Sequence, residues 1–92
     1  MDLNAVLSRN PNAAYRIYDG QATVVLPDRA EVHVINEVGS LVWDRIDGRR
    51  TLGQILDEVQ GVVTEGWDVG TETLRRDVLE FVRSLQEHGM VV

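Results

Sequence analysis

The sequence contains no cysteine and no lysine, and aromatic residues make up only 5% of it. The absence of cysteine excludes a disulfide scaffold, thiolate metal sites and a thiol nucleophile. The absence of lysine excludes Schiff-base chemistry and lysine-based phosphate loops. No apolar run is long enough to span a membrane, and the first residues lack a signal-peptide pattern. We therefore expect a soluble, cytoplasmic protein without a membrane partner.

The 92 residues are enough for one domain with a modest hydrophobic core. The formal net charge is −6, and all nine basic residues are arginine. Because an acidic protein repels the phosphate backbone, nucleic acid is a poor candidate partner.

Three short strands are predicted in the first part of the chain. Tyr15–Tyr18 and Gln21–Leu26 flank Asp19-Gly20, a pair typical of a β-hairpin turn. Pro27-Asp28-Arg29 predicts a second turn, and Glu31–Ile35 predicts a third strand. A three-stranded meander is too thin to be stable alone, so it must pack on the elements that follow.

Two helices are predicted within residues 35–56. Asn36 is a suitable N-cap for the first, and Asp47-Gly48 ends it, because glycine readily adopts the left-handed conformation common after a helix. Thr51 caps the second helix, and Gln54 completes a capping box. Both helices carry apolar side chains at helical spacing: Val38, Leu41, Val42 and Ile46 in the first, and Leu52, Ile55, Leu56 and Val59 in the second.

The C-terminal part predicts a loop and a third helix. Residues 61–70 are predicted to form a loop, in which Trp67 folds back on the core. The helix runs from about Glu72 to His88, is capped by Thr71 and is terminated by Gly89. Its predicted core face consists of Leu74, Val78, Phe81 and Leu85.

The predicted fold is an α+β, winged-helix-like domain, in which a three-stranded antiparallel β-meander precedes three α-helices (βββααα). We assign residues 15–92 to this domain. Residues 1–14 contain Asn10-Pro11-Asn12, a turn-forming cluster, and we expect them to form a partly ordered N-terminal tail.

No catalytic constellation is found in the sequence. His33 and His88 are far apart, and neither has a carboxylate at metal-ligand spacing, so both are expected to be surface histidines. The serines lie in no nucleophile elbow, and the glycines form no phosphate loop. We therefore expect a protein that is not an enzyme and has no catalytic residue, metal or cofactor.

The strand Glu31–Ile35 supplies a candidate interaction surface. It is the last strand of the meander, and an unpaired strand edge is a template for another chain. Adding a peptide strand there is a known recognition mode, in which backbone bonds give affinity and side-chain pockets give specificity. The same edge could instead pair with a second copy and form a homodimer.

The last helix supplies a second indication, because its apolar arc is wider than a core face needs. The arc continues through Val82 to Leu79. On its other side it stops abruptly at Asp77 and Ser84. Leu79 could therefore line a groove between this helix and the strand edge, or it could pack under the loop around Trp67.

An ordered set of features extends over most of the chain. It consists of an Asn-capped helix containing Val42-Trp43, the Ile46-Asp47-Gly48 turn, a Thr-capped helix and a long helix that ends in His-Gly-Met-Val-Val. Over roughly residues 15–92 this set resembles the PqqD family, small peptide-binding proteins also called precursor-peptide recognition elements or RiPP recognition elements.

The resemblance implies that the chain binds the leader of a ribosomally synthesised precursor peptide. In the family the leader adds as a strand in the cleft between the third strand and the third helix. Carried over, this points to the backbone of the strand and to side chains of the helix, where Arg75 could meet an acidic leader side chain. The peptide-binding residues implied are Glu31, Val32, His33, Val34, Ile35, Leu74, Arg75, Val78, Leu79 and Val82.

We therefore predict a non-catalytic peptide chaperone that presents its peptide to a separate modifying enzyme, in RiPP or PQQ-like biosynthesis. By resemblance, that enzyme could be a radical S-adenosylmethionine (radical SAM) protein or a leader peptidase. The main alternative is a winged-helix DNA-binding transcriptional regulator, in which a helix enters the major groove. Residues 52–70 contain four acidic residues and no basic one, which disfavours that alternative.

Overall fold

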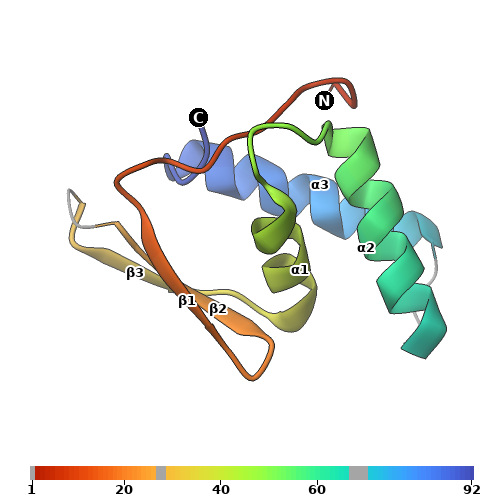
Figure 1. Ribbon diagram of the computed structural model, residues 1–92, viewed down its shortest axis with the longest axis horizontal. Coiled ribbons are helices and arrows are strands. Elements are labelled where there is room, and N and C mark those ends of the chain that lie inside the picture. Colours follow the sequence, from red (N-terminus) through yellow and green to blue (C-terminus); the bar gives the residue numbers. More distant parts are fainter. Residues whose placement is uncertain (1, 27–28, 67–70) are drawn as a thin grey trace.

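A computed structural model gives the fold and describes residues 2–26, 29–66 and 71–92. Its elements are, in order, β1 (Ala14–Tyr18), β2 (Gln21–Leu26), β3 (Glu31–Val34), α1 (Glu37–Arg45), α2 (Leu52–Gly66) and α3 (Thr71–Glu87). The predicted α+β order of three strands followed by three helices is therefore confirmed. Figure 1 shows the helices gathered on one side of the sheet.

The sheet is an antiparallel meander with the strand order β1-β2-β3. Tyr18 pairs with Gln21 across the β1–β2 turn. Asp19 and Gly20 have φ values of 51° and 78°, both in the left-handed region that a two-residue hairpin turn requires. The predicted hairpin is confirmed, whereas the predicted turn at residues 27–29 lies partly outside the described residues.

The core lies between the sheet and the helices. Alternate side chains of β2 are buried, as the two-residue period of a strand requires, and Trp43 of α1 is fully buried. Most apolar positions predicted on the three helices are buried: Val42, Ile46, Leu52, Ile55, Leu56, Val59, Leu74, Val78 and Leu85. Val38, Leu41 and Phe81 are partly buried against this core. Among the described helices, none combines the length and the apolarity of a membrane span.

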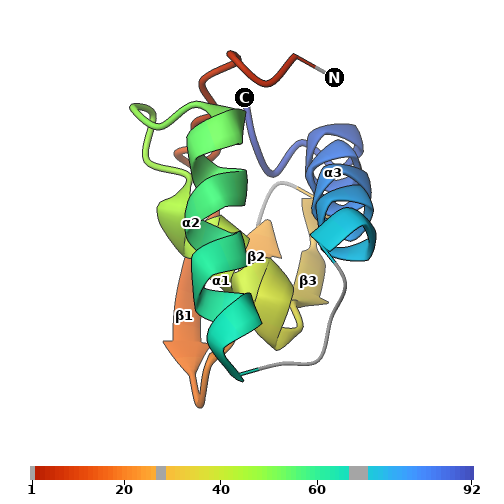
Figure 2. The same cartoon turned by 90° about the vertical axis from the view of Figure 1, so that its right-hand side faces the viewer.

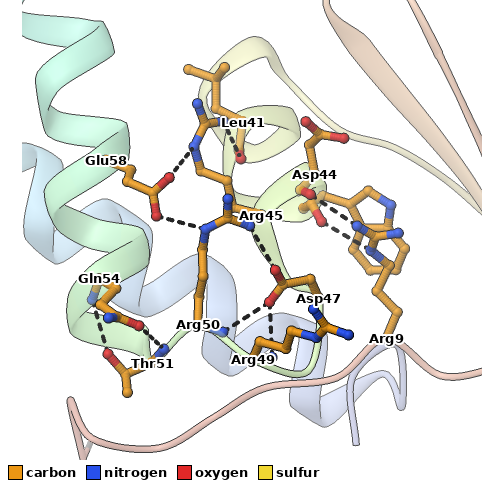
Figure 3. A network of polar contacts seen from close by, with 11 residues as sticks. Arg9, Leu41, Asp44, Arg45, Asp47, Arg49, Arg50, Thr51, Gln54 and Glu58 are labelled. Atoms are coloured by element: carbon orange, nitrogen blue, oxygen red, sulfur yellow. Dashed lines mark hydrogen bonds and ion pairs between the residues drawn. The ribbon is translucent and has the colours of Figure 1, made fainter.

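The predicted N-caps of α1 and α2 are confirmed. The Asn36 side chain accepts a hydrogen bond from the Gly39 N–H at 2.8 Å. Thr51 and Gln54 form the reciprocal capping box, with the Thr51 N–H 2.9 Å from Gln54 Oε1 and the Gln54 N–H 3.2 Å from Thr51 Oγ1 (Figure 3). Gly48 has the predicted left-handed conformation, with a φ of 78°, but it does not cap the helix, because α1 ends at Arg45 with Ile46 as its C-cap.

The prediction of a loop beginning at Gly61 is wrong, because α2 continues to Gly66. Val63 is fully buried and extends the four-residue spacing of Ile55 and Val59 by one more turn. Glycine within a helix costs about 1 kcal/mol, but burying one valine side chain gains about 1.5–3 kcal/mol. Trp67, for which a lid over the core was predicted, lies outside the described residues.

α3 ends in a glycine cap that brings the C-terminal residues back to the core. The Gly89 N–H donates to the Gln86 carbonyl at 3.1 Å, and the Met90 N–H donates to the Leu85 carbonyl at 2.8 Å. Gly89 has a φ of 70°, and Met90 is buried. These are the two hydrogen bonds of a Schellman motif, as the glycine and the apolar residue after it predict.

The segment of residues 2–10 is hydrogen-bonded to two distant parts of the chain. Its Ala5 and Leu7 carbonyls accept hydrogen bonds at 2.8 and 2.9 Å from N–H groups around the α1–α2 turn. Its Ser8 carbonyl accepts a hydrogen bond at 2.8 Å from the Val92 N–H. The Leu7 side chain is buried in the core. The segment therefore ties the α1–α2 turn to the C-terminal residues.

Candidate functional site

β3 forms one edge of the sheet, because it is the last strand in the order β1-β2-β3. The Ile35 N–H donates to the Ala22 carbonyl, on the β2 side, at 2.8 Å. Successive main-chain groups of an antiparallel strand alternate in direction, so the N–H and C=O groups of Val34 and Val32 point away from β2. No strand among the described residues pairs with this edge. It therefore offers two donors and two acceptors to an added strand.

A hollow of about 250 Å³ lies between β3 and α3. Figure 2 shows β3 as the strand nearest to α3. Polar and apolar residues of β3, of α3 and of the positions next to them line the hollow: His33, Val34, Ile35, Asn36, Phe81, Ser84, Leu85, His88 and Met90. An extended peptide at the β3 edge would send alternate side chains toward this space.

A second hollow, of about 160 Å³, adjoins the first between α1 and α3. Its lining is mainly apolar: Asn36, Val38, Gly39, Val42, Leu74, Asp77, Val78 and Phe81. Asn36 and Phe81 line both hollows, so Phe81 stands at the boundary between them. A Cβ on Gly39 would lie 3.1 Å from Phe81 Cζ and 2.5 Å from Ile35 Cγ2. Glycine at this position thus lets the Phe81 ring lie close to α1.

Two histidine rings contact each other edge to face in the first hollow. The centroids of His33 and His88 are 5.2 Å apart, and the rings meet at 70°. His33 Nε2 lies 2.9 Å from Glu31 Oε2, and His88 Nδ1 lies 2.8 Å from the Ser84 carbonyl oxygen. The hydrogen bond from His33 lowers the pKa of the Glu31 carboxyl below its ordinary value of 4.5, although desolvation opposes the shift.

The predicted β3 residues lie at this site. The side chains of His33 and Ile35 face the helices, whereas those of Val32 and Val34 are 64% and 71% exposed on the other face. Glu31, at the start of the strand, forms the hydrogen bond to His33. The strand residues therefore lie on two faces: His33 and Ile35 turn their side chains toward the hollow, and Val32 and Val34 contribute main-chain groups at the free edge.

The predicted α3 residues do not form one surface. Leu74 and Val78 are buried and line only the second hollow, and Val82 is fully buried in the core. Leu79 lies in a separate hollow with Arg76, Glu80 and Arg83, and β3 contributes no side chain to that hollow. Arg75 precedes Leu79 by one helical turn. The structure therefore does not bring Leu79 and Arg75 to the β3 groove.

At the C-terminal end of the chain, the helical residues that line the hollow beside β3 are Phe81, Ser84 and Leu85, together with His88 directly after α3. Sequence reasoning assigned Phe81 to the core and His88 to the surface, and it took Ser84 as the polar limit of the apolar arc. The width of an apolar arc shows how much of a helix is covered, but not which neighbour covers each side. The sequence places Phe81 at the polar limit of the arc, next to Asp77, but no pattern in it shows that β3 lies on this side of the helix.

A cluster of charged side chains at the α1–α2 turn lies away from this groove, and its members pair with one another (Figure 3). Arg50 contacts Asp47 Oδ2 and Glu58 Oε2, each at 2.8 Å, and Arg45 Nε lies 3.8 Å from Glu58 Oε1. The Arg50 and Arg49 N–H groups donate to the Asp47 carboxylate and lower its pKa. This cluster holds the α1–α2 turn. No group of three or more metal-ligating side chains occurs within the described ranges.

The family model described as coenzyme PQQ synthesis protein D (PqqD) matches residues 22–91. The chain belongs to the PqqD family. The match begins at the second residue of β2 and ends after the glycine cap of α3, so it includes both walls of the groove. No curated protein sequence matches the chain.

Two solved structures have the same fold as this PqqD-family chain. One, "TbiB1 in Complex with the TbiA(beta) Leader Peptide", has a TM-score of 0.71 and 18% sequence identity, and covers 91% of this chain and 93% of its own. The other, "Lasso peptide synthetase B1 complexed with the leader peptide", has a TM-score of 0.75 and 22% identity, and covers 96% of this chain and 99% of its own. At these identities the likeness establishes the fold.

Proposed function

We propose that this protein is a non-catalytic peptide chaperone. It binds the leader of a ribosomally synthesised precursor peptide by strand addition at β3 and presents the peptide to a separate enzyme. The observation that carries this proposal is the outward main-chain edge of Val32 and Val34 beside the hollow between β3 and α3.

Strand addition uses both parts of this site. The outward N–H and C=O groups of Val32 and Val34 can form four hydrogen bonds with an extended peptide, and each is worth about 0.5–1.5 kcal/mol net. The two hollows then receive side chains from the peptide face that is turned toward α3. Because Phe81 separates the hollows, one peptide can fill both, with side chains two or more positions apart.

The family match and the two neighbours support this proposal, since both neighbours are structures of complexes with leader peptides. Neither finding supports the alternative of a DNA-binding regulator. For the enzyme partner we propose a radical SAM protein or a leader peptidase, in RiPP or PQQ-like biosynthesis. This choice rests on family resemblance.

The test is a ¹⁵N–¹H NMR titration of the ¹⁵N-labelled protein with leader peptides encoded beside its gene. Saturable shifts are expected at Val32 and Val34 and at the α3 residues that line the hollow. Val34→Pro removes an outward N–H while leaving the β2 side of the strand unchanged, and it should weaken binding about tenfold, or about 1.4 kcal/mol. Val34→Thr is the matched control, because it keeps the N–H and the β-branched side chain.

Two outcomes would contradict the proposal. The first is a set of shifts that appears with duplex DNA at moderate salt and with none of the leaders. The second is leader binding that Val34→Pro does not weaken, because the peptide would then not use the β3 edge. The oligomeric state of the free protein should be measured by sedimentation in the same experiment. A homodimer that pairs two β3 strands would occupy the edge in place of the peptide.

A further inference from the structure

His33 and His88 are the two histidines of the chain, and both line the hollow between β3 and α3. In each ring, one nitrogen faces an oxygen that can only accept a hydrogen bond. For His33 Nε2 this is the Glu31 carboxylate at 2.9 Å, and for His88 Nδ1 it is the Ser84 carbonyl at 2.8 Å. These partners therefore place the single proton of each neutral ring on the bonded nitrogen.

The second nitrogen of each neutral ring is then a hydrogen-bond acceptor. Among the described residues, nothing donates to His33 Nδ1 or to His88 Nε2. Both rings line the hollow, and their centroids are 5.2 Å apart, so two rings that each carry one acceptor nitrogen border the same space. A hydrogen-bond-donating group between them would satisfy both, whereas a carboxylate would meet two lone pairs.

The charges around the rings also favour a cation. On β3, Glu31 borders His33, and the lowered pKa of its carboxyl keeps it ionised near neutral pH. On α3, Ser84 is neutral, and the Asn36 side chain before α1 is neutral as well. Arg29 is the opposing charge close to Glu31, but it is exposed, and its guanidinium lies beside Gly89. The protein as a whole carries a net charge of −6.

We propose that the hollow between β3 and α3 is a subsite for one basic side chain of the bound peptide, an arginine or a lysine that donates hydrogen bonds to His33 and His88. This inference rests on the proposed function, because the side chain reaches the hollow from a peptide added at β3. It also specifies the peptide chemistry, since a leader with a basic residue facing α3 is selected over one with an acidic residue there.

The subsite makes binding sensitive to acid. A proton added to either ring converts an acceptor into a donor and places a positive charge beside the basic side chain. Imidazole rings ordinarily take up this proton as the pH falls from about 7.5 to about 5.5. Peptides with the basic residue should therefore bind less tightly at the lower pH than at the higher one.

The test uses the full chain and a displayed library of random peptides of about 12 residues, longer than a typical strand of about 5–6 residues. The library is selected against the immobilised protein at about pH 7.5, and the affinity of the enriched peptides is then measured again at about pH 5.5. We expect arginine or lysine at one position of the enriched peptides, and release of these peptides at the lower pH.

Three variants separate the roles of the rings. His33→Gln combined with His88→Gln keeps an acceptor at each position but cannot be protonated, so it should keep the basic preference and lose the pH dependence. His33→Leu combined with His88→Leu removes both acceptors and should lose the preference. Gln86→Leu, on an exposed part of α3, is the matched control and should behave as the wild type does.

The outcomes distinguish this inference from the function on which it rests. Enriched peptides that need the β3 edge but carry no basic residue, or an acidic one, overturn the subsite and leave peptide binding standing. Basic peptides whose affinity stays constant with pH in the wild type also overturn it. A third outcome is that the wild type retains no more peptide than the immobilised Val34→Pro variant does. That result would contradict peptide binding at β3, and the subsite proposal would be overturned with it.

Discussion

At the scale of single residues, Asp47 shows how one carboxylate can hold a turn. Its Oδ1 atom accepts hydrogen bonds from the Arg49 and Arg50 N–H groups, each at 2.9 Å, and its Oδ2 atom lies 2.8 Å from Arg50 Nη1. The two N–H groups favour the ionised carboxylate, and they lower its pKa below the ordinary 3.8. The turn between α1 and α2 therefore depends on an ionised Asp47.

This dependence predicts an acid-sensitive contribution to stability. A carboxyl whose pKa is lower in the folded state stabilises the fold above its unfolded pKa, and that contribution is lost as the pH falls through the folded pKa. Asp47→Asn keeps the Oδ1 acceptor but cannot titrate. It should be less stable than the wild type near neutral pH, and the difference should vanish well below pH 3.8.

Urea unfolding at several pH values measures this difference. Asp57→Asn is a suitable control, because it changes an exposed carboxylate of α2 outside the α1–α2 turn and should follow the wild type. A difference between Asp47→Asn and the wild type that stays constant down to low pH would show that the side-chain shape, and not its charge, holds the turn.

Local chemistry explains why some single residues were predictable. Asn36, Thr51 and Gly89 act on backbone groups a few positions away, so their roles can be inferred from neighbouring residues alone. The pairing of His33 with His88 brings together β3 and the end of α3. No local pattern encodes it, and the sequence therefore predicted two separate surface histidines.

At the scale of elements, the capping box at the start of α2 gives a second test of stability. Thr51 Oγ1 accepts the Gln54 N–H, and replacing such a cap with alanine costs about 0.5–2 kcal/mol. Thr51→Ala should therefore lower the free energy of unfolding in urea by about this amount. Thr73→Ala, at an exposed position within α3, should have no effect or a slightly stabilising one. Equal losses for both variants would contradict a capping role.

Element boundaries and element faces differed in how well they could be predicted. The end of α2 was missed because Gly61 suggested a break, whereas Val63 continues the buried stripe and the helix persists. For α3, the apolar residues correctly indicated the core face. The groove face could not be predicted, because Phe81 faces β3 only once the sheet is placed beside the helix.

At the scale of the whole molecule, the two ends of the chain meet over the helices. The Asn10 N–H donates to the Met90 carbonyl, and the Asn10 side chain donates to the Gly89 carbonyl, each at 2.9 Å. These bonds fix the residues directly after His88, which forms part of the groove wall. The segment of residues 2–10 thus supports the groove without lining it. Its bonds to the α1–α2 turn and to Val92 are between backbone groups, so no side-chain pattern in the sequence indicates them.

Leu7 anchors this segment, because its side chain is 4% exposed and packs within the core. Leu7→Ala should lower the free energy of unfolding by about 2–5 kcal/mol, the cost typical of a buried leucine. Leu3→Ala is the matched control, since Leu3 is 37% exposed and should cost far less.

Amide hydrogen exchange distinguishes a local effect of Leu7→Ala from a global one. The Val92 N–H is held by the Ser8 carbonyl at 2.8 Å, whereas the Ile35 N–H is held within the sheet. If the segment docks as a unit, Leu7→Ala should accelerate exchange at Val92 far more than at Ile35, because the segment can open while the core stays folded. Equal acceleration at both amides would mean that Leu7 belongs to the global core, and that the groove wall loses its support only when the whole domain unfolds.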